Sequence, residues 1–307
     1  MIAILTGGTG GSKLVDGLAQ VVGQPAVTAI VNTADDDDFH GLRICPDLDI
    51  VTYALAGVVA ERGWGYQDDT FRCLEGLATY GRDAWFGLGD RDIATHIHRT
   101  LRIAEGWPLH EIAAEIAARL GVSATILPMT NELVRTQLTT ATGVKRFEEY
   151  LVRDGAREDI LSVVIDGVTT ATPAPGVLEA IAAAEMIVIA PSSPVVSIGT
   201  ILAVPGIRDG LRRRRADVVG VSPIIGDAPV EGPARRFLAG IGEYECSAPV
   251  MARLYADVCA RFVIHETDAD RAQEIQSLEV KPILADILMP DRASRARLAE
   301  FVVEQMV

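Results

Sequence analysis

The segment from Asn32 to Asp49 restricts the fold of this chain more than any other. It carries six aspartates in eighteen residues, together with one histidine and one arginine. A packed apolar core does not tolerate that density of charge, because burying an unpaired carboxylate is costly. The segment directly follows Val27 to Val31, an apolar run typical of a buried strand. We therefore expect a loop at the end of a strand, facing water, a cation or a ligand.

A glycine-rich turn follows the first apolar run. Ile2 to Leu5 predicts a strand, and residues 7–13 read Gly-Gly-Thr-Gly-Gly-Ser-Lys before a stretch with helical spacing. Glycines let backbone N–H groups approach an anion at a helix N-terminus, so this arrangement favours phosphate binding. The run matches neither G-x-G-x-x-G nor G-x-x-x-x-G-K-[ST]. A tight strand-to-helix turn without a ligand remains the alternative.

Further apolar runs alternate with helical patterns along the rest of the chain. Short runs typical of buried parallel strands occur at 124–127, 161–165, 186–189 and 217–221, with late candidates at 262–264 and 281–284. This alternation predicts an α/β fold, a Rossmann-like, three-layer, mainly parallel sheet formed by residues 1–49 and 122–307. Four helical patterns without a strand predict an inserted all-helical subdomain at 50–121. Residues 133–139 and 146–151 predict the two strands of a hairpin, and 295–306 an amphipathic helix.

Composition and net charge argue against several classes of binding partner. The 307 residues have a formal net charge of −14, which argues against DNA or RNA but not against a single nucleotide. Apolar runs stay below the roughly 18–20 residues that cross a bilayer, so no membrane partner is expected. The first residues lack a basic signal region, and four scattered cysteines form no C-x-x-C pair. We expect a cytoplasmic protein whose oligomeric state is open, with the 133–151 hairpin as a candidate homodimer contact.

Four predicted strand ends carry small or polar residues. In parallel sheets, ligands bind outside the carboxyl ends of the strands. The loops that leave those ends here are 7–13, 32–49, 191–199 and 222–227. Together they predict a pocket rich in N–H and hydroxyl donors, suited to phosphates and a base.

The acidic loop has two competing interpretations. In a dinucleotide-binding fold, one acid after the second strand holds the ribose hydroxyls, and Asp35 is placed for that role. One acid does not explain the others, whereas Mg²⁺ does, since it prefers one or two carboxylates with waters and substrate phosphates. Asp37 and Asp38 are interpreted as solvated loop charges. For Asp47 and Asp49, which precede a predicted helix, an N-cap role competes.

A second polar cluster lies inside the predicted helical insertion. Asp90 and Arg91 stand at a predicted helix start and indicate a ligand contact. His96 and Arg99 are three residues apart and share a face of that helix.

Eight short runs, in order along nearly the whole chain, resemble the 2-phospho-L-lactate transferase family of deazaflavin-coenzyme biosynthesis. They are G-G-T-G-G-S-K (7–13), N-T-A-D-D (32–36), H-G-L-R-I-C-P-D-L-D (40–49), D-D-T-F (68–71), L-G-D-R-D-x-A-T-H (88–96), L-P-M-T (127–130), P-S-S-P-V-V-S-I-G-T-I-L (191–202) and S-P-I-I-G-D-A-P-V-x-G-P-A (222–234).

The resemblance implies a function and a set of site residues. The implied reaction transfers a phospholactyl-type group from a guanylylated three-carbon phospho donor to the 8-hydroxy-5-deazaflavin Fo and releases GMP, in coenzyme F-420 biosynthesis. It implies that the donor nucleotide is held by Gly7, Gly8, Thr9, Gly10, Lys13, Ser192, Ser193, Gly199, Ser222 and Gly226. It implies that the acceptor is held by His40, Asp49, Asp90, Arg91 and His96. Mg²⁺ is assigned to Asp35, Asp36 and Asp47, and the catalytic role to Asp36 and Asp47.

Two other functions remain open from the sequence. A non-catalytic, nucleotide-sugar-binding regulator of the same fold would share the glycine turn but would need neither P-D-L-D nor L-G-D-R-D. A nicotinamide oxidoreductase would need a hydride-handling site that the sequence does not display. The sequence also leaves open whether the three-carbon group is phospholactate, phosphoenolpyruvate or phosphoglycerate.

Overall fold

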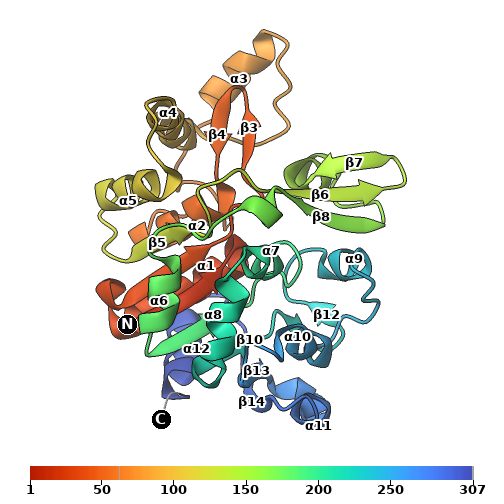
Figure 1. Cartoon of the computed structure of the whole chain (residues 1–307). Coiled ribbons are helices and arrows are strands. Elements are labelled where there is room, and N and C mark those ends of the chain that lie inside the picture. The colour runs from red at the N-terminus through yellow and green to blue at the C-terminus, as the bar shows by residue number, and fades with distance from the viewer. Residues whose placement is uncertain (62, 306–307) are drawn as a thin grey trace.

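The structure, a computed structural model, describes residues 1–61 and 63–305. Within them the central feature is a seven-stranded sheet whose pairings are all parallel (Figure 1). Its spatial order is β14 (Lys281–Ala285), β13 (Arg261–His265), β10 (Val218–Val221), β9 (Met186–Ile189), β1 (Ile2–Thr6), β2 (Val27–Val31) and β5 (Thr125–Pro128). The predicted α/β, Rossmann-like parallel sheet is confirmed.

The strand order reverses beside β1. From β1 the chain proceeds outward through β2 to β5, then returns to β9 on the other side of β1 and continues to β14. The two strands at the reversal end level with each other, because Leu5 pairs with Ile189 and the Ala190 N–H donates to the Leu5 carbonyl at 3.0 Å. The loops after β1 and β9 therefore diverge from one point, which is where such sheets form a ligand crevice.

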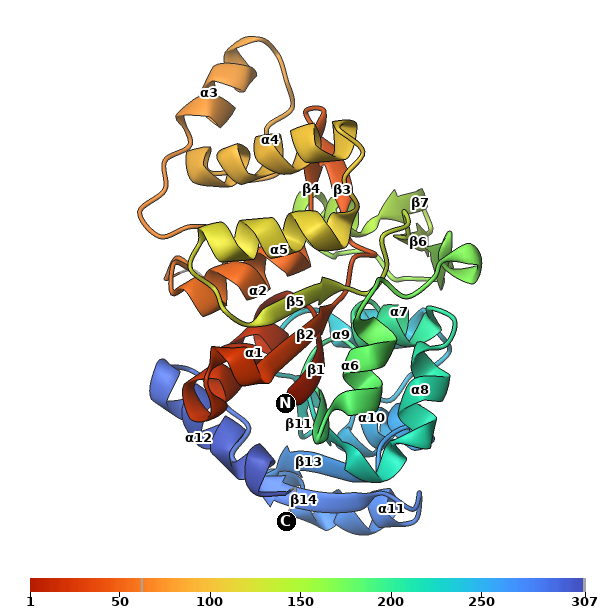
Figure 2. The same cartoon turned by 60° about the vertical axis from the view of Figure 1, so that its left-hand side comes forward.

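Helices cover both faces of the sheet (Figure 2). One face packs against α1 (Gly8–Val22), α2 (Pro46–Ala56), α5 (Leu109–Arg119) and α12 (Arg292–Glu304). The other packs against α6 (Val177–Ala183), α7 (Ile198–Ala203), α8 (Ile207–Arg213) and α10 (Ala248–Tyr255). Ile2 and Ile4 point to the first face, and Ala3 and Leu5 to the second. Burial on both faces explains why these strands are continuously apolar.

Beyond the carboxyl edge of the sheet lie the β3 (Asp37–Phe39) and β4 (Leu42–Ile44) hairpin and the helices α3 (Arg72–Thr79) and α4 (Asp90–Ala104), at the top of Figure 1. The hairpin was not expected, because the sequence reads as an acidic loop there. The chain between 50 and 121 contains most of α2 and the helices α3 to α5. Its division from the rest as a separate domain stays a prediction.

A small antiparallel sheet lies beside that edge. It has the order β7 (Gly143–Arg146), β6 (Arg135–Thr140) and β8 (Ser162–Asp166). Its β6–β7 pair confirms a hairpin in this stretch, but the second strand is β7 rather than 146–151, because Glu149–Arg153 forms a short π-helix. The expectation that 161–165 forms a buried parallel strand is wrong, since β8 pairs antiparallel with β6. Val164 is 53% exposed, so the apolar run of β8 does not mean burial on both faces.

The C-terminal half of the chain adds smaller elements. They include a short hairpin of β11 (Ile224–Ile225) and β12 (Ala228–Pro229), followed by α9 (Ala234–Ala239) and α11 (Ala272–Gln276). The expected end of the last helix at residue 306 lies outside the described residues. Across the described ranges, no helix combines the length and apolarity that a bilayer crossing requires.

Candidate active site

The glycine turn joins β1 to α1 and is held against two other loops. A Cβ atom at Gly7 would lie 2.5 Å from Asp47 Oδ2 and 2.9 Å from Ser197 Cβ, so only glycine allows this close approach. The Ser192 hydroxyl, in the loop after β9, accepts from the Gly7 N–H at 3.2 Å and donates to the Gly7 carbonyl at 2.7 Å. The structure thus joins the loops that leave β1 and β9.

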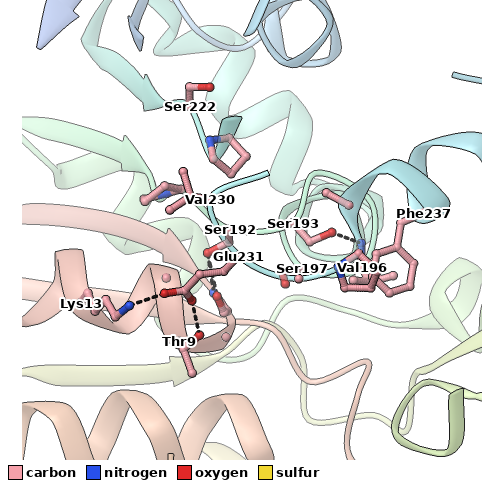
Figure 3. A pocket seen from close by; sticks show the side chains of 18 of the residues that line it. Thr9, Lys13, Ser192, Ser193, Val196, Ser197, Ser222, Val230, Glu231 and Phe237 are labelled. Atoms are coloured by element: carbon pink, nitrogen blue, oxygen red, sulfur yellow. Dashed lines mark hydrogen bonds and ion pairs between the residues drawn. The ribbon is translucent and has the colours of Figure 1, made fainter. Parts of the chain in front are cut away.

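A cavity of about 200 Å³ opens over this turn (Figure 3). Its apolar wall includes Val196, Val230 and Phe237. Most of the predicted nucleotide-binding residues line it, namely Gly7, Gly8, Thr9, Gly10, Lys13, Ser192, Ser193 and Ser222. Two predicted residues have other surroundings. Gly199 lies inside α7, where a Cβ atom would come within 2.5 Å of the Pro194 carbonyl oxygen, and Gly226 lies between β11 and β12.

The acidic segment is more buried than the sequence indicated. Its buried carboxylates are Asp35, Asp36, Asp37, Asp47 and Asp49. The interpretation of Asp37 as a solvated charge is wrong, because Asp37 forms an ion pair with Arg146 and lies 3.8 Å from Arg135. Asp38 remains exposed but pairs with Arg43 at 2.8 Å and with Arg135 at 3.0 Å. Two of these arginines come from the antiparallel sheet, about a hundred residues away, so the local sequence carries no sign of them.

Asn32, at the end of β2, organises two of the carboxylates. Its side-chain amide donates to Asp35 Oδ2 at 2.9 Å and to Asp47 Oδ2 at 2.8 Å. Its Oδ1 accepts from the Ala34 N–H at 3.0 Å and from the Thr200 hydroxyl at 2.6 Å. Asp47 Oδ1 in turn accepts from the Gly8 N–H at 2.8 Å. One amide therefore holds Asp35 and Asp47 together beside the glycine turn.

The electrostatics of this pair fit a bound cation. Burial, the nearby charge of Asp47 and that of Glu148 raise the pKa of Asp35 well above its usual range. Burial raises the pKa of Asp47 to about 6, although hydrogen bonds from Asn32 and Gly8 lower it. Among the described residues Asp35 Oδ1 has no hydrogen-bond partner, and no group of three or more His, Cys, Asp or Glu side chains is placed to hold a metal. Two carboxylates suffice for Mg²⁺ when substrate phosphates complete its coordination.

Asp36 has different surroundings from the pair. It lines a narrow recess together with Asp35 and Asp37, but unlike Asp35 and Asp47 it does not line the large cavity described below. Burial raises the pKa of Asp36 to about 8, against the lowering effect of Cys45 and Arg99. The prediction that Asp36 shares the metal stays a prediction, without support from this placement.

The start of α2 shows whether Asp47 or Asp49 is an N-cap residue. Cys45 is the N-cap residue of α2 and Pro46 its first helical residue. Asp47 and Asp49 lie in the first turn, so the N-cap interpretation of these two aspartates is wrong. Carboxylates in a first turn still interact favourably with the helix dipole.

A second cavity, of about 380 Å³, adjoins the first. Both are lined by Gly8, Thr9, Phe147, Leu151 and Ser197. The second adds the carboxylates Asp35, Asp47, Asp49 and Glu148, and the aromatic side chains Tyr53, Trp64 and Phe86. Asp35 and Asp47 line the second cavity only, but Asp47 accepts from the N–H of Gly8, one of the residues that both cavities share.

Asp49 belongs to a buried network with α4. It forms an ion pair with Arg99, which is 2% exposed, and lies 3.6 Å from His96 Nδ1. Arg99 also approaches His96 Nδ1 at 3.1 Å. Burial lowers the pKa of His96 to about 4, so this imidazole is neutral at pH 7. Asp49 and His96, both predicted to bind the acceptor, line the second cavity.

The other three residues predicted to bind the acceptor lie elsewhere. His40 occupies the exposed turn of the β3–β4 hairpin, with a φ of 54°. Asp90 begins α4 and accepts from the Cys73 N–H at 2.9 Å, which ties the first turn of α3 to the start of α4. Arg91 is exposed and donates to the Gln67 carbonyl at 3.3 Å. Their acceptor-binding roles stay predictions.

Sequence reasoning assigned no role to several residues of this site. Asn32 stood in the quoted N-T-A-D-D run, which was its only signal. Glu148 follows the β6–β7 hairpin and lines the second cavity, and burial with the charges of Asp47 and Asp37 raises its pKa to about 8. Nothing local in the sequence marks Glu148, since its charged neighbours in space, Asp37 and Asp47, come from β3 and α2.

Comparisons with known proteins agree over the full length of the chain. Residues 2–300 match the family model described as 2-phospho-L-lactate transferase CofD. A phosphoenolpyruvate transferase of Streptomyces griseus is 42% identical over 99% of this chain and 97% of its own length. A 2-phospho-L-lactate transferase of Methanosarcina acetivorans is 40% identical over 98% of this chain and 97% of its own.

The fold also has a solved counterpart. A crystal structure of a UPF0052 family member from Bacillus halodurans covers 98% of both chains with a TM-score of 0.64. At 20% sequence identity, that likeness concerns the fold alone.

Proposed function

The chain belongs to the 2-phospho-L-lactate transferase family and is a transferase, and from that premise we propose the reaction that it catalyses. It transfers a three-carbon phospho group, which is phospholactate, phosphoenolpyruvate or phosphoglycerate, from a guanosine diphosphate donor to a hydroxyl of the deazaflavin Fo. GMP is the leaving group, Mg²⁺ assists, and the product is a precursor of coenzyme F-420.

The observation that supports this proposal most is that the two cavities share the start of α1, where the Gly8 N–H donates to Asp47 beside Asp35. The first has N–H and hydroxyl donors on its floor and an apolar wall, which suits a diphosphate and a base. The second has aromatic side chains, which suit a planar ring system. A group transferred between ligands in these two cavities would pass the carboxylate pair.

Different residues of the site have different roles in the proposed reaction. The N–H groups at the start of α1 and the Lys13 ammonium bind donor phosphates and offset their charge. Asp49, fixed by Arg99, and the neutral His96 orient the acceptor. Asp35 and Asp47 would hold the cation, which would supply neutralisation of the charge on the non-bridging oxygens. Positioning and charge neutralisation supply most of the catalysis in such transfers, so we infer direct in-line attack by the acceptor hydroxyl.

The reaction can be tested directly. Purified protein is incubated with Fo and Mg²⁺ and with each of the three guanylylated donors in turn. Mass spectrometry of the product identifies the group transferred, and chromatography quantifies GMP. Donor turnover without an Fo adduct would refute the acceptor. A phospho-enzyme trapped with donor alone would refute direct transfer. GMP release also separates this enzyme from a non-catalytic nucleotide-sugar binder.

A further inference from the structure

A loop from another part of the chain covers the glycine turn. We call residues 226–232, which include β12 and follow β11, the flap. The flap carries Glu231 onto the turn, where the Thr9 hydroxyl donates to Glu231 Oε2 at 2.6 Å and Lys13 forms an ion pair with Oε1 (Figure 3). The carboxylate thus contacts the first two turns of α1 from the cavity side.

The Glu231 carboxylate occupies the position at which a bound phosphate would be expected. Thr9 and Lys13 are the groups that a bound phosphate would use, because both donate to anionic oxygen. Partial burial raises the pKa of Glu231, but the hydrogen bonds from Lys13 and Thr9 outweigh that effect and leave the pKa below its usual value. Glu231 is therefore charged at neutral pH. A carboxylate and a phosphate would repel each other at this point, so only one of them can occupy it.

The flap has the features of a segment that can move. Gly226 and Gly232, at its two ends, have positive φ angles of 60° and 72°, and both have open space where a Cβ atom would be. Its β11–β12 pairing spans two residues a strand. Apart from that pairing, the Gly226 N–H donates to Asp268 Oδ1 at 2.8 Å, and the Val230 N–H to the Pro223 carbonyl at 2.9 Å. On the exposed side of the flap, Asp227 accepts from Arg235 through its carbonyl and lies 3.8 Å from Arg271. Segments with so few buried contacts open at low free-energy cost.

We propose that Glu231 is an internal anion that holds the flap closed over the glycine turn, and that the phosphates of an incoming ligand displace it. Entry then favours ligands with enough negative charge to take both Thr9 and Lys13, such as a nucleoside diphosphate, over uncharged nucleosides. This inference rests on the proposed use of the turn as the donor phosphate site. The free protein is closed, and binding requires opening, so the apparent affinity is reduced by the fraction of molecules that are open.

The test compares ligand binding to the full chain and two variants by isothermal titration calorimetry. Glu231→Gln removes the charge and keeps the shape. Glu185→Gln is the matched control, because Glu185 pairs with the N-terminal ammonium at the opposite edge of the sheet. The ligands are GDP and inorganic diphosphate. We expect Glu231→Gln to lower the Kd for both by roughly fivefold, the scale of a partly exposed ion pair, and Glu185→Gln to change neither.

The outcomes separate this inference from the proposed function. An unchanged or raised Kd for diphosphate in Glu231→Gln overturns the inference, even if GDP binds and the proposed donor stands. A Kd raised for GDP alone also overturns it, since Glu231 would then contact the nucleoside. Tighter diphosphate binding without any GDP binding supports the inference and refutes the guanosine donor. Hydrogen exchange in the wild-type chain is a second measurement: diphosphate should speed exchange of the flap amides, and slowed exchange would contradict opening.

Discussion

The substitution Asp47→Asn tests the assignment of the carboxylate pair most directly. The new amide keeps an oxygen for the Gly8 N–H, but its nitrogen replaces the oxygen that accepts from Asn32 at 2.8 Å. One hydrogen bond to a charged group is lost, which costs about 1.5–3 kcal/mol. The repulsion of Asp35 is removed at the same time, which offsets part of that cost. We therefore expect a folded protein of nearly unchanged stability.

Turnover should respond far more than stability. Removing one group that stabilises developing charge lowers the rate by roughly two orders of magnitude or more, which corresponds to about 2.7 kcal/mol in the barrier. The assay is GMP release with Fo at saturating Mg²⁺, with Mn²⁺ affinity by electron paramagnetic resonance and thermal unfolding measured alongside. Asp16→Asn is the control, because Asp16 is also buried but pairs with Arg295 at 3.1 Å, on the α1–α12 side. Near-normal turnover in Asp47→Asn would show that Asp47 only stabilises the first turn of α2.

Three further changes test other parts of the site. Arg99→Met leaves the buried Asp49 without its ion-pair partner, so urea denaturation should show a loss of about 3–5 kcal/mol; a loss below 1 kcal/mol would contradict a buried pair. Gly7→Ala places a Cβ atom 2.5 Å from Asp47 Oδ2 and should weaken Mn²⁺ binding about tenfold by titration. Unchanged Mn²⁺ binding would show that the glycine turn does not control the position of Asp47. Glu148 has its pKa raised from 4.5 to about 8, so its contribution to stability is present below pH 4.5 and is lost as pH rises through 8. Glu148→Gln should therefore flatten the fall of melting temperature between pH 5 and pH 9, and equal slopes would refute the burial of that charge.

The fold was predictable because its signals are local. The apolar runs of β1, β2 and β9 are continuous, since these strands are buried on both faces, and the turn after β1 shows its glycines directly. The run at 161–165 shows where this reasoning fails. An apolar run of five residues is compatible with either a central strand or a partly exposed antiparallel one, and only the pairing with β6 decides.

The location of the site was predictable from the sequence, but the contacts of its carboxylates were not. The carboxyl ends of β1, β2 and β9 brought the predicted loops together, as the rule for parallel sheets requires. The contacts of several of these aspartates depend on residues distant in sequence. Arg146 turns Asp37 from a surface charge into a buried ion pair, and Glu148 adds to the charge around Asp35. No pattern within 32–49 encodes either contact.

The hydrogen bonding of Asn32 has a consequence for how a cation would be received. All four positions of its amide are filled, so the side chain cannot rotate without losing bonds to the loop after β2, to α2 and to α7. The spacing of Asp35 and Asp47 is therefore fixed before any ligand arrives, and their mutual repulsion is built in during folding. A cation entering such a preorganised pair loses little to rearrangement and relieves that repulsion. Its affinity would then be tuned partly by Thr200, a residue that need never touch it.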